Sequence, residues 1–368
     1  MSELAEIFQQ YGSEYRAKYE QRMPTGHKAA MKAIEQCRTE QLGGHVYTCE
    51  AGQVSAYSYH SCRNRHCPKC QNQAGQRWLE RQQQLLLPTP YFMVTFTLPE
   101  PLRKIARSHQ KVMYNLLFQS AAAALQELAQ DPRFVGGQIG MVGVLHTWGR
   151  DLSYHPHVHF LVPGGGLAAD GRQWLASRPT FLVHVRPLSK LFRAKFRAAL
   201  QKTELFNEVP YQLWREAWVV HSQVVGNGQA ALKYLAPYIF RVALSNKRLV
   251  KVAEGKVTFR YTPSGSKKSR RCTLPAEEFM RRFLQHVLPK GLVKVRYYGL
   301  FSPGQRQRLK QARNLLAAQQ PPEPQPANEA NSTEVTNGLA QHSSILCPQC
   351  RHPMVWQQKL KPVWPQPP

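Results

Sequence analysis

Three histidines lie at spacings that could hold a divalent metal ion. In the stretch YHPHVHFLVP, one apolar residue separates His157 from His159, so in a β-strand both imidazoles point to the same face. Residues 139–148 have the pattern of a second strand, and in a hairpin His146 can face the same space. Three imidazoles can bind one ion and leave positions open for a substrate oxygen. A single histidine on such a strand is more often a core residue, but three at this spacing favour a metal.

Two tyrosines share one face of a predicted helix. The stretch QAALKYLAPYIFR follows a Gly-Asn-Gly loop and places Tyr234 and Tyr238 four positions apart. Taken alone, a tyrosine pair at this spacing is more often packing than chemistry. The tyrosines therefore need a second line of evidence.

The cysteines predict zinc. Five of the eight cysteines fall between positions 37 and 70, and such clusters in a reducing compartment are more often zinc ligands than disulfides. The expected tetrahedral ligand set is Cys49, Cys62, Cys67 and Cys70. Three residues are possible substitutes, namely Cys37, His45 and His66, because Gly52 stands where a further cysteine would be expected after Cys49.

A second CxxC motif lies near the C-terminus. Cys347 and Cys350 provide two certain ligands, so this motif needs Cys272 or His352 as a partner, or it binds nothing. The sequence alone is compatible with each of these three alternatives.

The charge balance predicts a polyanionic partner. The chain of 368 residues carries 49 Lys plus Arg against 22 Asp plus Glu, a formal net charge of +27. Nucleic acid is the first candidate, with a solvated basic surface as the plainer alternative. No apolar run approaches the length of a membrane span, and the acidic N-terminus is unlike a signal peptide, so we expect a cytoplasmic protein without a membrane partner. The expected phosphate-contacting residues are Arg63, Arg65, Lys69, Lys267, Lys268, Arg270 and Arg271.

The elements that would position these residues predict an α+β fold. A strand over 91–101, a helix over 102–130 and the histidine hairpin are typical of an antiparallel sheet with helices on one face. We further expect strands over 181–185 and 218–225, helices over 188–202 and 276–287, and two strands around a basic turn near residue 268. The expected parts are a helical segment (1–36), a zinc-binding domain (37–88), a catalytic core (89–245), a basic DNA-binding region (246–318), a disordered linker (319–345) and a CxxC tail (346–368).

Four motifs in this order resemble a known family. They are SCRNRHCPKCQ, HPHVHFLVPGGG, KYLAPYIFRVALSNKRL and TLPAEEFMRRFLQHVLPKGLVKVRYYGLFSP, which together span about residues 37–303. The chain resembles the insertion-sequence ninety-one family of bacterial transposases, which are two-tyrosine members of the histidine-hydrophobic-histidine (HUH) endonucleases.

The resemblance implies a site and a reaction. It makes His157 and His159 the ligands of a catalytic Mg²⁺ or Mn²⁺, with His146 or, in reserve, His155 as the third. It makes Tyr234 and Tyr238 the nucleophiles, on a helix beside a ferredoxin-like or RNA-recognition-motif-like antiparallel sheet. The implied function is rolling-circle transposition through a 5′-phosphotyrosine, on single-stranded or hairpin DNA at the element ends and on target DNA. The protein would act in the bacterial cytoplasm, associated with the nucleoid.

Two alternatives and one departure accompany this interpretation. A replication initiator or conjugative relaxase would use the same core, although the cysteine-rich N-terminal region and the basic C-terminal region favour a transposase. A zinc-dependent DNA-binding protein would have histidines and tyrosines that only pack. Pro237 lies between the tyrosines and removes a helix hydrogen bond, so one nucleophile is better supported than two equal ones.

Overall fold

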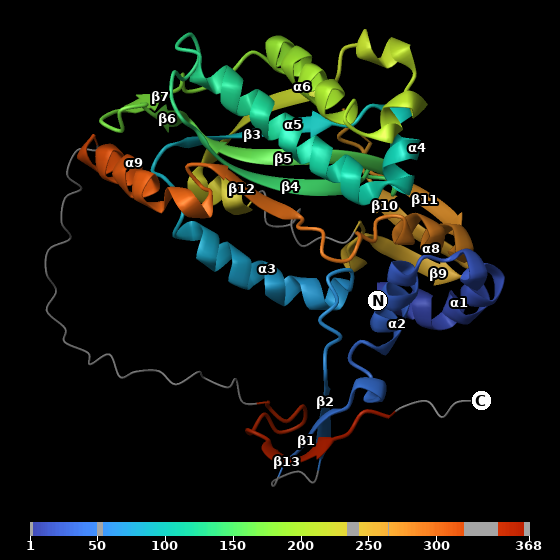
Figure 1. Cartoon of the computed structure of the whole chain (residues 1–368). Coiled ribbons are helices and arrows are strands. Elements are labelled where there is room, and N and C mark those ends of the chain that lie inside the picture. Colours follow the sequence, from blue (N-terminus) through green and yellow to red (C-terminus); the bar gives the residue numbers. More distant parts are fainter. Residues whose placement is uncertain (1–2, 50–53, 234–242, 264, 320–344, 364–368) are drawn as a thin grey trace, which may run out of the picture.

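The computed structural model describes residues 3–49, 54–233, 243–263, 265–319 and 345–363. It is a mixed α+β structure built on antiparallel sheets (Figure 1). Among the helices of these ranges, none combines the length and the apolar character needed to cross a lipid bilayer.

A five-stranded antiparallel sheet lies at the centre. Its strand order is β12-β4-β5-β3-β8. The strands are β3 (Pro90–Thr97), β4 (Gly140–Trp148), β5 (Tyr154–Pro163), β8 (Val220–Asn227) and β12 (Val295–Gly299). The predicted histidine hairpin is present as β4 and β5, which place the two histidine-bearing segments side by side in the middle of the sheet.

Three helices cover one face of this sheet (Figure 1). They are α4 (Glu100–Ser108), α5 (Gln110–Gln130) and α6 (Val185–Leu200). In α5 the buried residues Met113, Leu117, Ala121 and Leu125 recur every four positions, which gives the helix one apolar face. That face packs on the side of β5 that carries Val158, Phe160 and Val162.

The opposite face is covered as well, which corrects the expectation of helices on one face only. Side chains of α3 (Pro68–Gln83) and α9 (Arg306–Ala318) share a hydrophobic core with Val142, Val144 and Leu161 of the sheet. Val142, Val144 and Leu161 on this second face are therefore buried under helices. Because strand residues alternate, this is also the face of His146, His157 and His159.

The N-terminal helices pack against the basic C-terminal region. Helices α1 (Leu4–Tyr19) and α2 (Thr25–Gln36) form one core with α8 (Ala276–Leu284) and a small sheet. That sheet consists of β9 (Leu249–Ala253), β10 (Lys256–Tyr261) and β11 (Arg270–Pro275), in the order β11-β10-β9. The predicted pair of strands around a basic turn is therefore β10 and β11.

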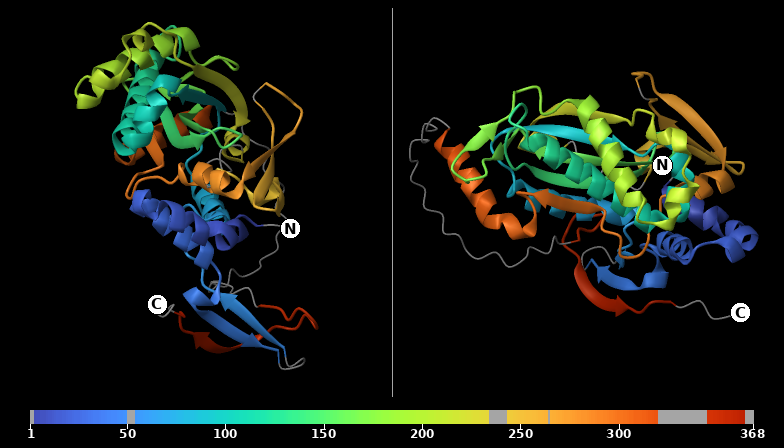
Figure 2. Two further views of the ribbon diagram at one scale, coloured as in Figure 1. Left: turned by 90° about the vertical axis from the view of Figure 1, so that its right-hand side faces the viewer. Right: turned by 45° about the horizontal axis from the view of Figure 1, so that its top comes forward.

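A third small sheet joins the two ends of the chain. It consists of β1 (Gly44–Thr48), β2 (Ser55–Tyr59) and β13 (Val355–Leu360), in the order β13-β1-β2. Figure 2 shows this sheet at one end of the molecule, away from the central sheet. The segment expected as a separate CxxC tail thus folds onto the N-terminal hairpin.

Two sequence predictions were wrong in detail. Residues 181–185 form no strand: Phe181 makes an isolated bridge to Arg178, and α6 already begins at Val185. The apolar run there is buried under the helices, and a run this short cannot distinguish a strand from another buried segment. The predicted helix over 102–130 is two helices, because the backbone leaves helical geometry at His109.

Short elements complete the fold. The paired strands β6 (Gly165–Leu167) and β7 (Trp174–Ala176) follow the glycine run after β5. The 3-10 turns are η1 (Glu20–Arg22), η2 (Glu40–Leu42), η3 (Glu204–Glu208), η4 (Tyr211–Trp214), η5 (Asn246–Arg248) and η6 (Pro303–Gln305).

Candidate active site and metal centres

The β4–β5 hairpin brings His146, His157 and His159 together. His146 is paired directly with His157 across the two strands, and His159 lies one alternation further along the same face. The ring centroid of His146 lies 5.2 Å from that of His157 and 4.7 Å from that of His159. The centroids of His157 and His159 lie 4.8 Å apart. One nitrogen of each ring lies within 4.8 Å of the others, which is the arrangement of a three-imidazole metal site.

Hydrogen bonds fix two of these rings. The Nδ1 of His157 lies 2.7 Å from the carbonyl oxygen of His155, to which it donates. The Nδ1 of His159 lies 2.8 Å from the Thr95 hydroxyl on the neighbouring strand β3. Both bonds occupy Nδ1, which leaves Nε2 as the nitrogen that can coordinate a metal. Metal-binding imidazoles are usually oriented in this way.

Burial keeps the imidazoles neutral. Burial lowers the pKa of His159 to about 4. The pKa of His157 lies well below its ordinary value, mainly because the ring is buried and secondly because His159 is close by. His146 is 1% exposed and stacks on Trp148 at a centroid distance of 4.9 Å. Neutral imidazole is the form that coordinates a metal, and the lowered pKa values of His157 and His159 favour that form.

The two candidates for the third position are placed differently. His146 belongs to the group of three nitrogens, whereas His155 does not. The ring of His155 lies 5.2 Å from that of His157, and it is the His155 backbone carbonyl that contacts the site. The placement therefore favours His146 over His155.

Tyr234 and Tyr238 lie outside the described residues. The chain that leads to them is described: residues 228–233 are helical, and Ala231 and Leu232 are buried with Val142, Val144 and Leu161. Those sheet residues share a face with the histidines. The helical segment directly before Tyr234 thus packs on the histidine side of the sheet.

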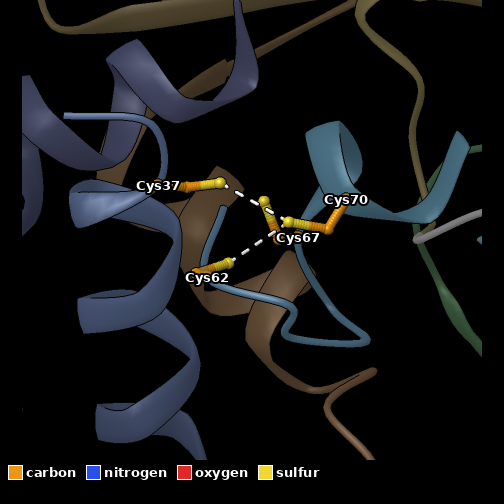
Figure 3. A group of neighbouring side chains, drawn as sticks. All are labelled: Cys37, Cys62, Cys67 and Cys70. Carbon is orange, nitrogen blue, oxygen red and sulfur yellow. Dashed lines mark hydrogen bonds between the residues drawn. The ribbon is translucent and has the colours of Figure 1, made fainter. Parts of the chain in front are cut away.

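A second cluster contains four thiols. Cys37, Cys62, Cys67 and Cys70 lie with their sulfur atoms within 4.8 Å of one another, turned toward a common centre (Figure 3). The Sγ of Cys70 lies 3.5 Å from those of Cys37 and Cys62. The hydrogen bond with Cys62, together with backbone N–H groups, lowers the pKa of Cys67, which favours its thiolate form. This donor set fits a structural zinc ion.

The predicted zinc ligand set was wrong at one position. The sequence analysis chose Cys49 and kept Cys37 as a substitute, and the structure reverses the two. The reason is distance: β1 lies between them, and a five-residue strand extends about 17 Å. Cys37 ends α2 beside the CPKC knuckle, whereas Cys49 is carried to the far end of the hairpin.

Comparison with known proteins identifies the family of the chain. A family model described as a putative transposase matches residues 140–309, and one described as a transposase zinc-binding domain matches residues 7–98. The putative transposase y4qJ of Sinorhizobium fredii is 39% identical over 369 residues, which cover 95% of this chain and 92% of the relative. The chain belongs to the insertion-sequence ninety-one family of transposases.

A second relative is more distant. The transposase for insertion sequence element IS801 of Pseudomonas savastanoi pv. phaseolicola is 28% identical over 283 residues, covering 72% of this chain and 68% of the relative. No solved structure matches. As a transposase, the protein acts on DNA by strand cleavage and transfer.

Two of the basic residues predicted to contact DNA have partners within the transposase. The Arg65 guanidinium donates hydrogen bonds to the carbonyl oxygens of Leu292 at 2.6 Å, Pro289 at 2.7 Å and Leu288 at 3.2 Å. Lys69 pairs with Glu3 at 2.6 Å. Sequence proximity to the zinc knuckle could not reveal these partners, because they lie far away along the chain.

The other predicted basic residues of the transposase are exposed. Arg63 lies on the surface beside the thiol cluster, and the remaining four lie at the turn between β10 and β11 and at the start of β11: Lys267, Lys268, Arg270 and Arg271. Exposed positive charge on a protruding hairpin is suited to the DNA backbone.

The transposase also has a basic cleft that sequence reasoning missed. The cleft has a volume of about 1350 Å³ and lies between the N-terminal helices, the α4–α5 junction and the segment after α8. Its lining includes Arg22, Arg107, Lys111 and Lys290. These residues come from three separate parts of the chain, so no local pattern could have predicted their convergence.

Proposed function

We propose that this transposase cuts a single DNA strand by tyrosine attack on a phosphate beside the His146, His157 and His159 triad. One observation carries the proposal: the three imidazoles converge on a sheet face, and the helical segment that precedes Tyr234 packs on that same face. The antiparallel sheet with its histidines on the central strands β4 and β5 is consistent with an HUH nuclease core.

The triad suits a divalent cation. Its donors are three imidazoles, two of which, His157 and His159, are oriented by hydrogen bonds at Nδ1. A bound Mg²⁺ or Mn²⁺ would supply Lewis-acid polarisation of a non-bridging phosphate oxygen. Because all three protein ligands are nitrogen, we expect Mn²⁺ to bind more tightly than Mg²⁺, which prefers oxygen ligands.

The covalent step would conserve the phosphodiester bond energy. The hydroxyl oxygen of Tyr234 or Tyr238 bonds to phosphorus as the bond to the 3′ oxygen breaks. The tyrosine loses its proton, and the departing 3′ oxygen gains one. The products are a 5′-phosphotyrosine and a free 3′-hydroxyl, and no water is consumed, so reversal rejoins strands. A second tyrosine allows two strands to be held at once, as rolling-circle transposition requires.

The basic surfaces support a single-stranded or hairpin substrate. In-line attack needs the scissile phosphate to reach a side chain on the sheet face, which a continuous duplex restricts. The cleft lined by Arg107, Lys111 and Lys290 and the exposed β10–β11 turn offer cationic contacts for such a strand. We infer that these surfaces hold the DNA on either side of the cut.

A covalent-adduct assay tests the proposal. The full chain is incubated with end-labelled single-stranded oligonucleotides of element-end sequence and Mn²⁺, and protein–DNA species that survive denaturation are measured. We expect Tyr234→Phe and Tyr238→Phe each to reduce the adduct and the double variant to abolish it. Tyr211→Phe is the matched control, because Tyr211 is 58% exposed in η4, outside the proposed site. Survival of the adduct in the double variant would overturn the assignment.

A further inference from the structure

Three cysteines outside the four-thiol cluster meet at the junction of the chain's two ends. The sulfur atoms of Cys49, Cys347 and Cys350 lie within 4.8 Å of one another. The Sγ atoms of Cys49 and Cys350, 301 positions apart in the sequence, lie 3.3 Å apart. Contact between residues so distant along the chain requires the fold to bring them together.

Backbone hydrogen bonds position each of these thiols. Cys49 follows β1, and its N–H donates to the carbonyl oxygen of Val54 at 3.0 Å, which closes the end of the β1–β2 hairpin. Cys347 and Cys350 form a tight knuckle. In it the N–H of Cys347 donates to the backbone carbonyl oxygen of His352 at 2.9 Å, and the N–H of Arg351 donates to the backbone carbonyl oxygen of Cys347 at 3.0 Å. Strand β13 then pairs with β1 from Thr48 to Gly44, which holds the knuckle over Cys49.

The hydrophobic core around these thiols is too small to stabilise the three-stranded sheet by apolar packing alone. The core beneath the three-stranded sheet consists of Cys49, Cys347 and Met354, flanked by a few half-buried residues. Cys49 is 2% exposed and Cys347 is fully buried. Such small modules usually need a metal or a disulfide to stay folded.

The geometry favours a metal over a disulfide. A disulfide joins two sulfurs about 2.05 Å apart and would leave the third thiol unused. Tetrahedral zinc with Zn–S distances of about 2.3 Å places sulfurs about 3.8 Å apart, which is close to the separation of Cys49 and Cys350. Three convergent thiols, two of them from a CxxC knuckle, are the donor set that zinc selects.

We propose a second zinc site formed by Cys49, Cys347 and Cys350, which fastens the C-terminal segment to the N-terminal β1–β2 hairpin. The site joins the segment that contains β13 to the hairpin of β1 and β2. The three-stranded sheet is then a single unit built from both termini. No step of DNA cleavage enters this proposal, so it stands or falls independently of the proposed function.

Three thiols fill three positions of a tetrahedral zinc site. Within the described residues, no further Cys, His, Asp or Glu joins them. The sequence has Gly52 three positions after Cys49, the spacing of a CxxC knuckle. The variant Gly52→Cys supplies a fourth thiol at that spacing, and we expect it to bind zinc more tightly.

Metal counting tests the site. The full chain carrying His157→Ala/His159→Ala, which removes the imidazole triad as a zinc site, is purified under reducing conditions, and zinc per chain is measured by plasma mass spectrometry. We expect two zinc ions in this parent chain and one when Cys347→Ser/Cys350→Ser is added. The control Cys272→Ser, which removes a thiol outside both cysteine clusters, retains two. A value of one zinc in the parent chain, or of two after the cysteine substitutions, would overturn the proposal.

Two further readouts separate zinc from its alternatives. Alkylation of the denatured, unreduced chain should label all eight cysteines, whereas six labelled cysteines would show a disulfide and contradict the site. Zinc loss to a competing chelator should slow at least tenfold in Gly52→Cys. An unchanged rate would contradict a three-thiolate site with an open position.

Tail attachment provides the structural readout. The chain is cut by protease within residues 320–344 and passed over a gel-filtration column. We expect the C-terminal fragment to elute with the body and to separate from it when zinc is chelated or in Cys347→Ser/Cys350→Ser. Elution with the body under both conditions would show that the zinc does not hold the tail.

Discussion

Replacing Thr95 with valine removes the hydroxyl that holds His159. The Thr95 side chain lies 2.8 Å from the Nδ1 of His159, across the β3–β5 pair. Valine has nearly the same shape and an equally high strand propensity, so β3 should keep its fold. The substitution therefore tests orientation of the imidazole, separate from packing.

The expected magnitude follows from the role of such supporting bonds. Loss of a hydrogen bond that orients a metal-binding imidazole typically costs about 10- to 100-fold in metal affinity, or about 1.4–2.8 kcal/mol. Because His159 is one of three ligands in the proposed site, the whole cost should appear as weaker Mn²⁺ binding. The amount of adduct at saturating Mn²⁺ should be restored.

The assay is a Mn²⁺ titration of covalent adduct formation. We expect the half-saturating Mn²⁺ concentration to rise 10- to 100-fold in Thr95→Val. The matched control is Thr97→Val on the same strand: Thr97 pairs with His157, but its hydroxyl makes no hydrogen bond to an imidazole among the described residues. A titration curve for Thr95→Val that coincides with that of the unmodified chain would refute the reasoning.

The remaining predictions concern metal preference, DNA binding and stability. Adduct formation should saturate at a lower concentration of Mn²⁺ than of Mg²⁺, and the reverse order in parallel titrations would argue against an all-imidazole site. Replacing Lys267, Lys268, Arg270 and Arg271 with glutamine should weaken single-strand binding and reduce its logarithmic salt slope by about 3, measured by fluorescence anisotropy; an unchanged slope would exclude this turn from the interface. Arg65→Ala should lower the urea midpoint and leave the salt slope unchanged, because its guanidinium bonds to Leu288, Pro289 and Leu292 within the protein. Burial lowers the pKa of His286 to about 3, below the ordinary 6.5 of the unfolded chain. Between these pH values the unfolded state binds more protons than the folded state, so the free energy of unfolding should fall as the pH drops through this range. His286→Gln should therefore reduce the fall in urea midpoint between pH 7 and pH 5.

The histidine hairpin could be predicted because its signals are local. His157 and His159 alternate on one strand, the polar loop before them marks a turn, and His146 is close enough in sequence for a hairpin to place it opposite. The same locality explains why the strands around the basic turn and the long apolar stripe of α5 could also be predicted.

The cysteine ligands could not be sorted from the sequence because their partners are distant. The sequence favours Cys49 as a ligand with Cys37 as a substitute, and the length and direction of β1 place Cys37 with the other three thiols instead. The pairing of β13 with β1 joins segments roughly 300 residues apart, for which alternation along one strand gives no signal. The acceptors of Arg65 could not be predicted for the same reason, since they belong to the segment after α8.

The most direct test of the central claim is to map the residue that becomes bonded to DNA. The adduct formed with a single-stranded oligonucleotide and Mn²⁺ is digested with protease and nuclease, and the modified peptide is identified by tandem mass spectrometry. We expect a nucleotide 5′-phosphate on Tyr234 or Tyr238. We expect this modified peptide to be absent in His157→Ala/His159→Ala. A phosphate on any other residue, or an undiminished adduct in the double histidine variant, would contradict the central claim.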